Sequence, residues 1–213
     1  SATTSAEQAE QILAFIQKNS LSVEWILETH VHADHLTAAQ YIKAQTGGKT
    51  AISHNIALVQ QTFSAIYNFD MKYFNSNQIF DHLFEDHEAF KIGGMDAYNM
   101  PTPGHTPACL SYVIGDAVFV GDTLFAMGCG RMFEGSYEQM FHSLQRLAAL
   151  PPQTQVYCTH EYTLANAKFA LSVEPDNVAL QQRADHVEHL RYLDKITLPS
   201  SIEQELATNP FLR

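Results

Sequence analysis

Four side chains that bind metals well lie within six residues: His30, His32, Asp34 and His35. Imidazole and carboxylate groups are the usual ligands of zinc and of non-haem iron. If the backbone is near-extended, His30, His32 and Asp34 point to one side while His35 turns towards a second ion. The segment therefore predicts a metal site with room for two neighbouring cations. The alternative is a loop of solvated histidines in which Asp34 only caps the next helix, but a cap needs no histidines beside it.

Three later residues of the same chemical types also follow predicted strands. His105 lies in the turn Pro103-Gly-His-Thr-Pro107, Asp122 follows the apolar run 117–121, and His160 follows the run 155–158. Each signal is weak alone, because an Asp or His after a strand is more often a turn former or a structural residue. Taken in order with the first cluster, at the strand ends where layered α/β proteins carry their chemistry, they predict one composite site.

The elements that must position these residues follow from the apolar periodicity. We predict helices at residues 7–19, 36–45, 56–66 and 137–149 and over most of 176–208. We predict strands at residues 23–28, 50–53, 89–92, 96–101, 109–114, 117–121 and 155–158, and an aromatic-rich loop at 73–88. Apolar residues at helical spacing predict that the first helix packs on one face, through Ile12, Leu13, Phe15 and Ile16. Strands and helices interleave, with hairpins in the middle, which predicts an α/β fold of sheets covered by helices in layers.

Composition restricts the class of protein. A chain of 213 residues with 46% hydrophobic residues can bury a full core, and its length favours one domain with at most a small addition. No apolar run is long enough for a membrane span, and no secretory signal pattern is present. The net charge of -11 argues against nucleic-acid binding. Three cysteines in no pairing pattern predict a reducing compartment, so we expect the cytoplasm.

The ordered set His-x-His-x-Asp-His, Gly-His-Thr, Gly-Asp-Thr and a late strand-end histidine resembles the metallo-β-lactamase superfamily. The resemblance implies an αββα sandwich with the metal site at the edge of two facing sheets. We expect a metallo-β-lactamase-type domain at 1–163 and a C-terminal helical segment at 164–213. The chain begins at the first helix, so the first N-terminal strands of that fold are expected to be missing. A sheet edge left open in this way can be covered by strand exchange, so we expect a monomer or a homodimer.

The resemblance also implies a ligand set. It comprises His30, His32 and His105 for one ion, Asp34, His35 and His160 for the other, and Asp122 as a bridge. We expect two divalent ions, with zinc as the first choice and iron or a mixed iron–zinc pair as the alternative. Asp34 and Asp122 are the expected catalytic carboxylates. Class B lactamases mostly have a cysteine where this chain has Asp122, so antibiotic hydrolysis is not expected.

Two branches of the superfamily are represented in the chain. Residues 26–39, and the region through 121–125, resemble the persulfide dioxygenase-like and β-lactamase-hydrolase-like proteins. Residues 128–135, 158–163 and 209–213 are similar to glyoxalase II, the hydroxyacylglutathione hydrolase. The Gly-Asp-Thr-Leu-Phe motif occurs in both branches, which suggests a hybrid chain of natural or engineered origin. The glyoxalase II resemblance implies glutathione contacts from Arg131 and Tyr162, with Phe133 where some relatives have tyrosine.

These patterns lead to a predicted function. We expect a metal-dependent thioester hydrolase of the glyoxalase II type, which cleaves S-2-hydroxyacylglutathione to a 2-hydroxy acid and glutathione through a metal-bound hydroxide. The expected partner is this small glutathione thioester, and no nucleic acid or membrane. One alternative is a persulfide dioxygenase with a single non-haem iron held by His30, His105 and Asp122. A second is a metal-binding protein with little turnover. The His160-Glu-Tyr-Thr163 context favours the hydrolase.

Overall fold

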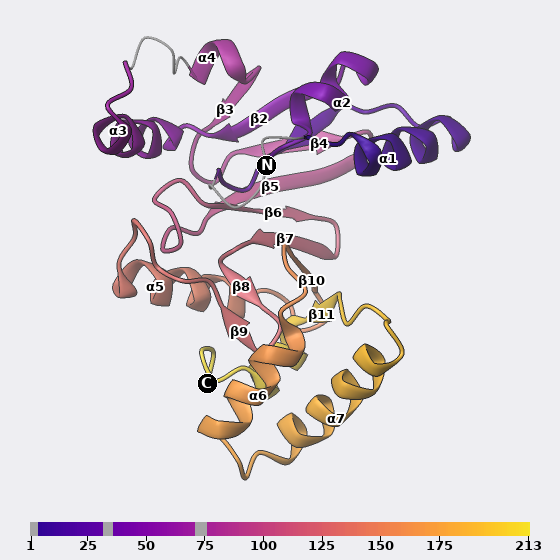
Figure 1. The fold of residues 1–213 in the computed structure, drawn as a ribbon, viewed down its shortest axis with the longest axis vertical. Helices are drawn as coiled ribbons and strands as arrows, with labels where there is room; N and C mark the ends of the chain where they lie inside the picture. The colour runs from indigo at the N-terminus through magenta and orange to yellow at the C-terminus, as the bar shows by residue number, and fades with distance from the viewer. Residues whose placement is uncertain (1–3, 32–35, 71–75) are drawn as a thin grey trace.

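Two β-sheets face each other in the centre of the molecule, and helices cover both outer sides (Figure 1). The computed structural model describes residues 4–31, 36–70 and 76–213. The first sheet is parallel and has the order β1-β2-β3. Its strands and the helices around it are α1 (Glu7–Lys18), β1 (Trp25–Leu27), α2 (Ala39–Thr46), β2 (Lys49–Ser53), α3 (Ile56–Tyr67), α4 (Ser76–Ile79) and β3 (His82–Phe84).

The second sheet is mixed and has the order β11-β10-β7-β6-β5-β4. The strands are β4 (Ala89–Ile92), β5 (Met95–Pro101), β6 (Leu110–Ile114), β7 (Ala117–Gly121), β10 (Gln155–Cys158) and β11 (Ser200–Ser201). The strands β8 (Leu124–Phe125) and β9 (Gly128–Cys129) form a separate hairpin. The remaining helices are α5 (Tyr137–Ala148), α6 (Thr163–Val173), α7 (Val178–Tyr192) and α8 (Ile202–Thr208).

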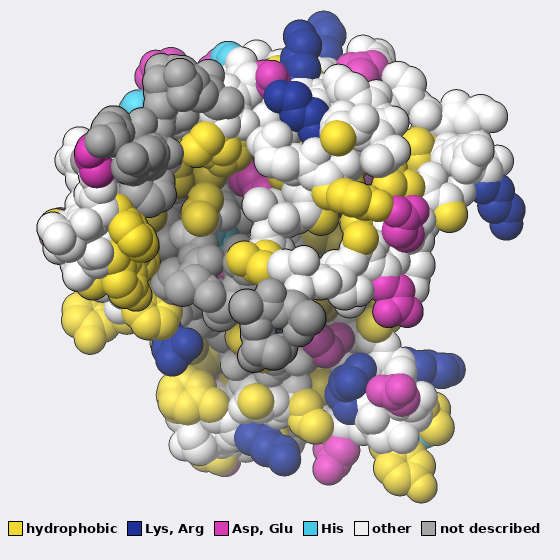
Figure 2. Space-filling model, turned by 45° about the horizontal axis from the view of Figure 1, so that its top comes forward, with side chains coloured by type: hydrophobic (Ala, Val, Ile, Leu, Met, Phe, Trp, Pro, Cys, Tyr) yellow, Lys and Arg dark blue, Asp and Glu magenta, His cyan; other side chains and the backbone are white. Residues whose placement is uncertain are grey.

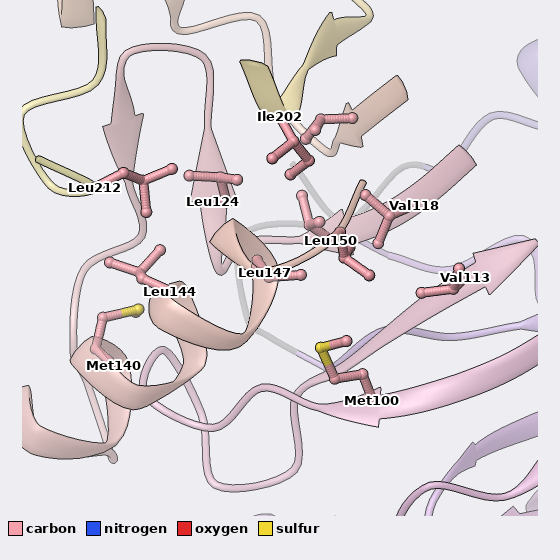
Figure 3. Close-up of a cluster of buried hydrophobic side chains, with 12 residues drawn as sticks. Met100, Val113, Val118, Leu124, Met140, Leu144, Leu147, Leu150, Ile202 and Leu212 are labelled. Atoms are coloured by element: carbon pink, nitrogen blue, oxygen red, sulfur yellow. The ribbon is translucent and has the colours of Figure 1, made fainter. Parts of the chain in front are cut away.

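Alternation along the strands creates the layers, because successive side chains point to opposite faces of a sheet. On β2, Ala51 packs between the sheets with Tyr112 of β6, whereas the next residue, Ile52, packs outward against α3. On β6, Val113 points to the opposite face from Tyr112 and joins the core beneath α5. The result is the αββα sandwich expected from the sequence. Figure 3 shows the outer core of α5 and the second sheet, with Met140, Leu144 and Leu147 of α5 near Val118, Leu124, Leu150, Ile202 and Leu212.

Local sequence signals fix several helix ends. Ser136 and Gln139 form a reciprocal capping box at the start of α5. Gly47 ends α2 in a left-handed conformation with φ 75°, which glycine adopts without steric cost. Within the described ranges, no helix combines the length and the apolar character that crossing a membrane requires.

The C-terminal segment is joined to the sandwich rather than detached from it. Its strand β11 pairs antiparallel with β10, and Ile202 enters the core beneath α5. Helices α6 and α7 pack together through small and branched residues, around Met127 of the β8–β9 turn. The guanidinium of Arg183 on α7 bonds the buried carboxylate of Glu205 on α8 at 2.6 Å.

Most predicted elements are confirmed within a few residues, but residues 73–88 are not only a loop. This region contains α4 and β3, and β3 pairs in parallel with β2. His82 Nε2 lies 2.8 Å from Glu88 Oε1, and the Asp81 carboxylate accepts from the Thr50 amide at 2.8 Å. The prediction of a packed first helix was also partly wrong, because Ile12 and Phe15 are 50% and 62% exposed.

Candidate metal centre

Three of the predicted ligands converge at one edge of the sandwich. His30 follows β1, His105 lies in the turn between β5 and β6, and Asp122 directly follows β7. One ligand atom of each lies within 4.8 Å of the others, and all three residues are buried. The Nε2 atom of His105 is 3.5 Å from Asp122 Oδ2, and that of His30 is 4.0 Å away.

A fourth predicted ligand approaches from the end of β10. His160 places its Nε2 atom 3.6 Å from the same Asp122 Oδ2. These separations are longer than ordinary hydrogen bonds. Two ligands about 2.1 Å from a tetrahedral ion are about 3.4 Å apart, so the spacing suits atoms that share a metal. His32, Asp34 and His35 lie outside the described residues.

The buried carboxylate provides a second test of fit. Asp122 Oδ1 has no hydrogen-bond partner among the described residues. A buried carboxylate oxygen without a partner is costly, and a cation satisfies it. Imidazole nitrogens together with a carboxylate form a ligand set suited to divalent zinc or iron. The site therefore fits a divalent metal.

Outer contacts orient the histidine rings. His105 Nδ1 lies 2.7 Å from the carbonyl oxygen of Arg131, which can only accept, so Nδ1 carries the proton and Nε2 is the nitrogen that offers a lone pair. His30 Nδ1 lies 3.1 Å from the hydroxyl of Thr29. In both histidines the second ring nitrogen faces Asp122. Neither Thr29 nor the Arg131 carbonyl was predicted from the sequence, although Thr29 adjoins the first ligand.

Two glycines permit the close approach of segments around the site. Gly121 has φ 53°, and a Cβ there would lie 2.5 Å from Thr29 Oγ1. A Cβ on Gly130 would lie 1.7 Å from the carbonyl oxygen of Asp122. Any side chain at these positions would displace the segments that carry His30 and Asp122. A steric requirement therefore accounts for glycine at position 121 of Gly-Asp-Thr and at position 130 of Gly-Cys-Gly.

Both predicted substrate residues lie beside the ligand histidines. The ring of Tyr162 stacks on that of His160, with centroids 4.8 Å apart, and contacts Phe125 at 5.3 Å. The exposed guanidinium of Arg131 lies over the Phe133 ring, 4.9 Å from its centroid. Phe133 in turn packs edge-on against His105. Phe125, which also packs against His160, was missed by sequence reasoning although it belongs to the quoted Gly-Asp-Thr-Leu-Phe motif.

The three cysteines are poor nucleophiles. Burial raises the pKa of the Cys109, Cys129 and Cys158 thiols to about 11. A thiol, not a thiolate, therefore predominates at neutral pH.

Comparisons with known proteins bear on the whole chain. Residues 1–160 match the metallo-beta-lactamase superfamily and residues 161–213 match the hydroxyacylglutathione hydrolase C-terminus. Hydroxyacylglutathione hydrolase from Methylococcus capsulatus is 43% identical over 194 residues, which cover 88% of this chain and 68% of that protein. The Brucella anthropi protein of the same name is 41% identical over 218 residues, covering 100% of this chain and 76% of the relative.

Solved structures show the same fold. ETHE1 from Myxococcus xanthus superposes with a TM-score of 0.66 at 26% identity, covering 96% of this chain and 69% of that one. The BLEG-1 B3 metallo-beta-lactamase superposes with a TM-score of 0.63 at 21% identity, covering 96% of this chain and 84% of that one.

The Brucella anthropi relative matches the whole chain, including both sides of residues 121–125, so no hybrid origin is needed to explain the sequence. The chain belongs to the hydroxyacylglutathione hydrolase family of the metallo-beta-lactamase superfamily.

Proposed function

We propose that this chain hydrolyses S-2-hydroxyacylglutathione to a 2-hydroxy acid and glutathione. The observation that carries the proposal is the convergence of His30, His105 and His160 on Asp122. It occurs in a chain that is 41% identical, over its whole length, to a relative named hydroxyacylglutathione hydrolase. A divalent metal is the cofactor that this family and this site imply.

We propose two ions per chain, with zinc as the first choice and iron or an iron–zinc pair as the alternative. The full ligand set that we propose is His30, His32 and His105 for one ion, Asp34, His35 and His160 for the other, and Asp122 between them. The position of Asp122 supports this, because its Oδ2 atom faces members of both histidine sets. When bound, such ions polarise a carbonyl and lower the pKa of water towards about 7.

The residues of the chain supply position and charge. The Arg131 carbonyl holds the His105 ring, and stacking on Tyr162 holds the His160 ring. We assign the Arg131 guanidinium to a glutathione carboxylate, since charge-assisted contacts of this kind give orientation as well as affinity. We assign the Tyr162 hydroxyl, on a ring that is 47% exposed, to the peptide backbone of glutathione. The thiolate leaving group needs little proton assistance, because a thiol is far more acidic than an alcohol.

A persulfide dioxygenase is the second candidate. His30, His105 and Asp122 alone form the two-histidine, one-carboxylate set that suits a single non-haem iron. The structural similarity to ETHE1 is a second reason to consider this candidate. The His160-Glu-Tyr-Thr163 context favours the hydrolase, and the structure places His160 Nε2 3.6 Å from Asp122 Oδ2.

One pair of assays separates the two candidates. The metal-loaded protein is given S-lactoylglutathione, and kcat/KM is measured from thioester loss. Oxygen uptake with glutathione persulfide is measured in parallel on the same preparation. We expect thioester hydrolysis without oxygen uptake. Rapid oxygen uptake with no thioester loss would reject the hydrolase assignment.

We also propose a cellular location. None of the three cysteines forms a disulfide, which supports a reducing compartment, and we propose the cytoplasm.

The assembly of the protein is a separate proposal. Strand β1 lies at the edge of its sheet in the described part of the chain. A homodimer formed through this edge therefore stays a prediction, beside the monomer.

A further inference from the structure

An apolar cavity of about 540 Å³ is lined on one side by Val31, the residue after His30. One face of α3 forms its main wall, because Ile56, Val59, Phe63 and Tyr67 recur at helical spacing. Val31 and Phe80 line it from the neighbouring segments. Figure 2 shows hydrophobic side chains at the edge of a hollow in this face of the molecule.

Two chain connections place the cavity beside the ligands. Val31 directly follows His30, so this wall is one residue from the first metal-binding side chain. On the other side, Ile56 and Val59 pack against Ala108, which is three residues after His105. Consecutive Cα atoms are about 3.8 Å apart, so Val31 adjoins His30, and Ala108 lies within about 11 Å of His105.

The lining is also electrically neutral. It contains no charged residue in the described part of the chain. Among its polar side chains, Thr37 donates to Glu28 and accepts from the Ala39 amide, and the Gln60 side-chain oxygen accepts from Ser76 at 2.7 Å. The carboxylates of glutathione would find no charged partner in this lining, whereas an apolar group would replace water in a mostly apolar space.

We propose that this cavity binds the apolar substituent of the acyl group, and that the preferred substrates are thioesters with a long or aromatic acyl side chain. The inference rests on the proposed function. A volume of about 540 Å³ lies in the range of ligand pockets, whereas the single methyl of a lactoyl group fills only a small part of it. The enzyme therefore distinguishes a long or aromatic acyl group from a lactoyl group through apolar surface that only the larger group covers.

The test compares two glutathione thioesters that differ only in the acyl group, S-lactoylglutathione and S-(3-phenyllactoyl)glutathione. For the wild type we expect kcat/KM to favour the phenyllactoyl thioester by at least about tenfold, as burial of an added apolar group in a pocket predicts. Val59→Phe fills the cavity and should lower kcat/KM for the phenyllactoyl thioester about tenfold, leaving the lactoyl value within about twofold. Leu58→Phe is the matched control, because Leu58 is on the same helix, 47% exposed and outside the lining.

A second variant tests the cavity independently, in case Val59→Phe does not fold. Phe63→Ala removes part of the wall and should also reduce the preference, whereas Ile66→Ala, at a position 64% exposed on α3, should not. Equal hydrolysis of both thioesters by the wild type would overturn the cavity assignment and leave the proposed function standing. If neither thioester is hydrolysed, the proposed function fails. The cavity assignment is then tested by comparing the calorimetric affinities of the protein for 3-phenyllactate and for lactate. Tighter phenyllactate binding that Val59→Phe or Phe63→Ala abolishes supports the cavity, and equal binding of the two acids rejects it.

Discussion

At the scale of single residues, Asp122 is the side chain on which the site depends. Its Oδ2 atom faces three imidazoles, and its Oδ1 atom has no hydrogen-bond partner among the described residues. The sequence predicted Asp122 as part of the site because it follows an apolar strand, and the family resemblance implied that it bridges two ions. The sequence could not predict that the Arg131 carbonyl orients the His105 ring, because only the fold brings these two residues together. The contact of Thr29 with His30 joins neighbours in the sequence and was overlooked.

Replacing Asp122 should remove metal and activity together. Asp122→Ala would remove the carboxylate that we propose as the ligand of both ions, so metal affinity and kcat should each fall at least about a hundredfold. Arg131→Ala should instead raise KM for a glutathione thioester about tenfold or more, through loss of a charge-assisted contact, with metal content unchanged. Elemental analysis and steady-state kinetics on both variants check this, with Asp116→Ala in an exposed turn as the control. Equal loss of metal in the Arg131 and Asp122 variants would show that Arg131 is misassigned.

At the scale of elements, the hairpin β8–β9 and the residues after it connect the parts of the site. Phe125 of β8 packs against the His160 ring, and Gly130 follows β9 directly against the Asp122 backbone. The amide of Met127, in the turn, donates to the buried carboxylate of Glu205 at 2.9 Å. These two-residue strands carry no periodic signal, so the sequence could not predict them. The longer apolar strands β5, β6 and β7 were predicted because alternation over several residues does give such a signal.

The close approach at Gly130 gives a test at this scale. Gly130→Ala would bring a Cβ to 1.7 Å from the Asp122 carbonyl oxygen, so one backbone segment must shift. We expect a loss of about 2 kcal/mol or more in the free energy of unfolding, with reduced metal content. Gly94→Ala is the matched control, since no atom lies within 4 Å of a Cβ there. Denaturant unfolding of both variants measures the difference, and an equal effect of the two substitutions would remove the steric explanation.

At the scale of the whole molecule, the C-terminal segment supports the metal-binding sandwich. Its residue Asn209 donates to the carbonyl oxygens of Phe125 and Gly128, and Arg183 pairs with Glu205 inside the same core. The sequence predicted the sandwich and the helical segment from the order of motifs. The division at residues 163 and 164 stays a prediction, because β11 belongs to the same sheet as β7 and β10. Because the net charge is -11, an anionic thioester requires local positive charge, which we propose that the metal and Arg131 supply.

We propose that this chain hydrolyses glutathione thioesters through a site that holds two metal ions. The most direct test is to titrate metal-free protein with zinc and follow hydrolysis of S-lactoylglutathione against metal equivalents per chain. The account predicts that activity rises until two equivalents are bound and then remains constant. A plateau at one equivalent, or no hydrolysis at any zinc content, would contradict it.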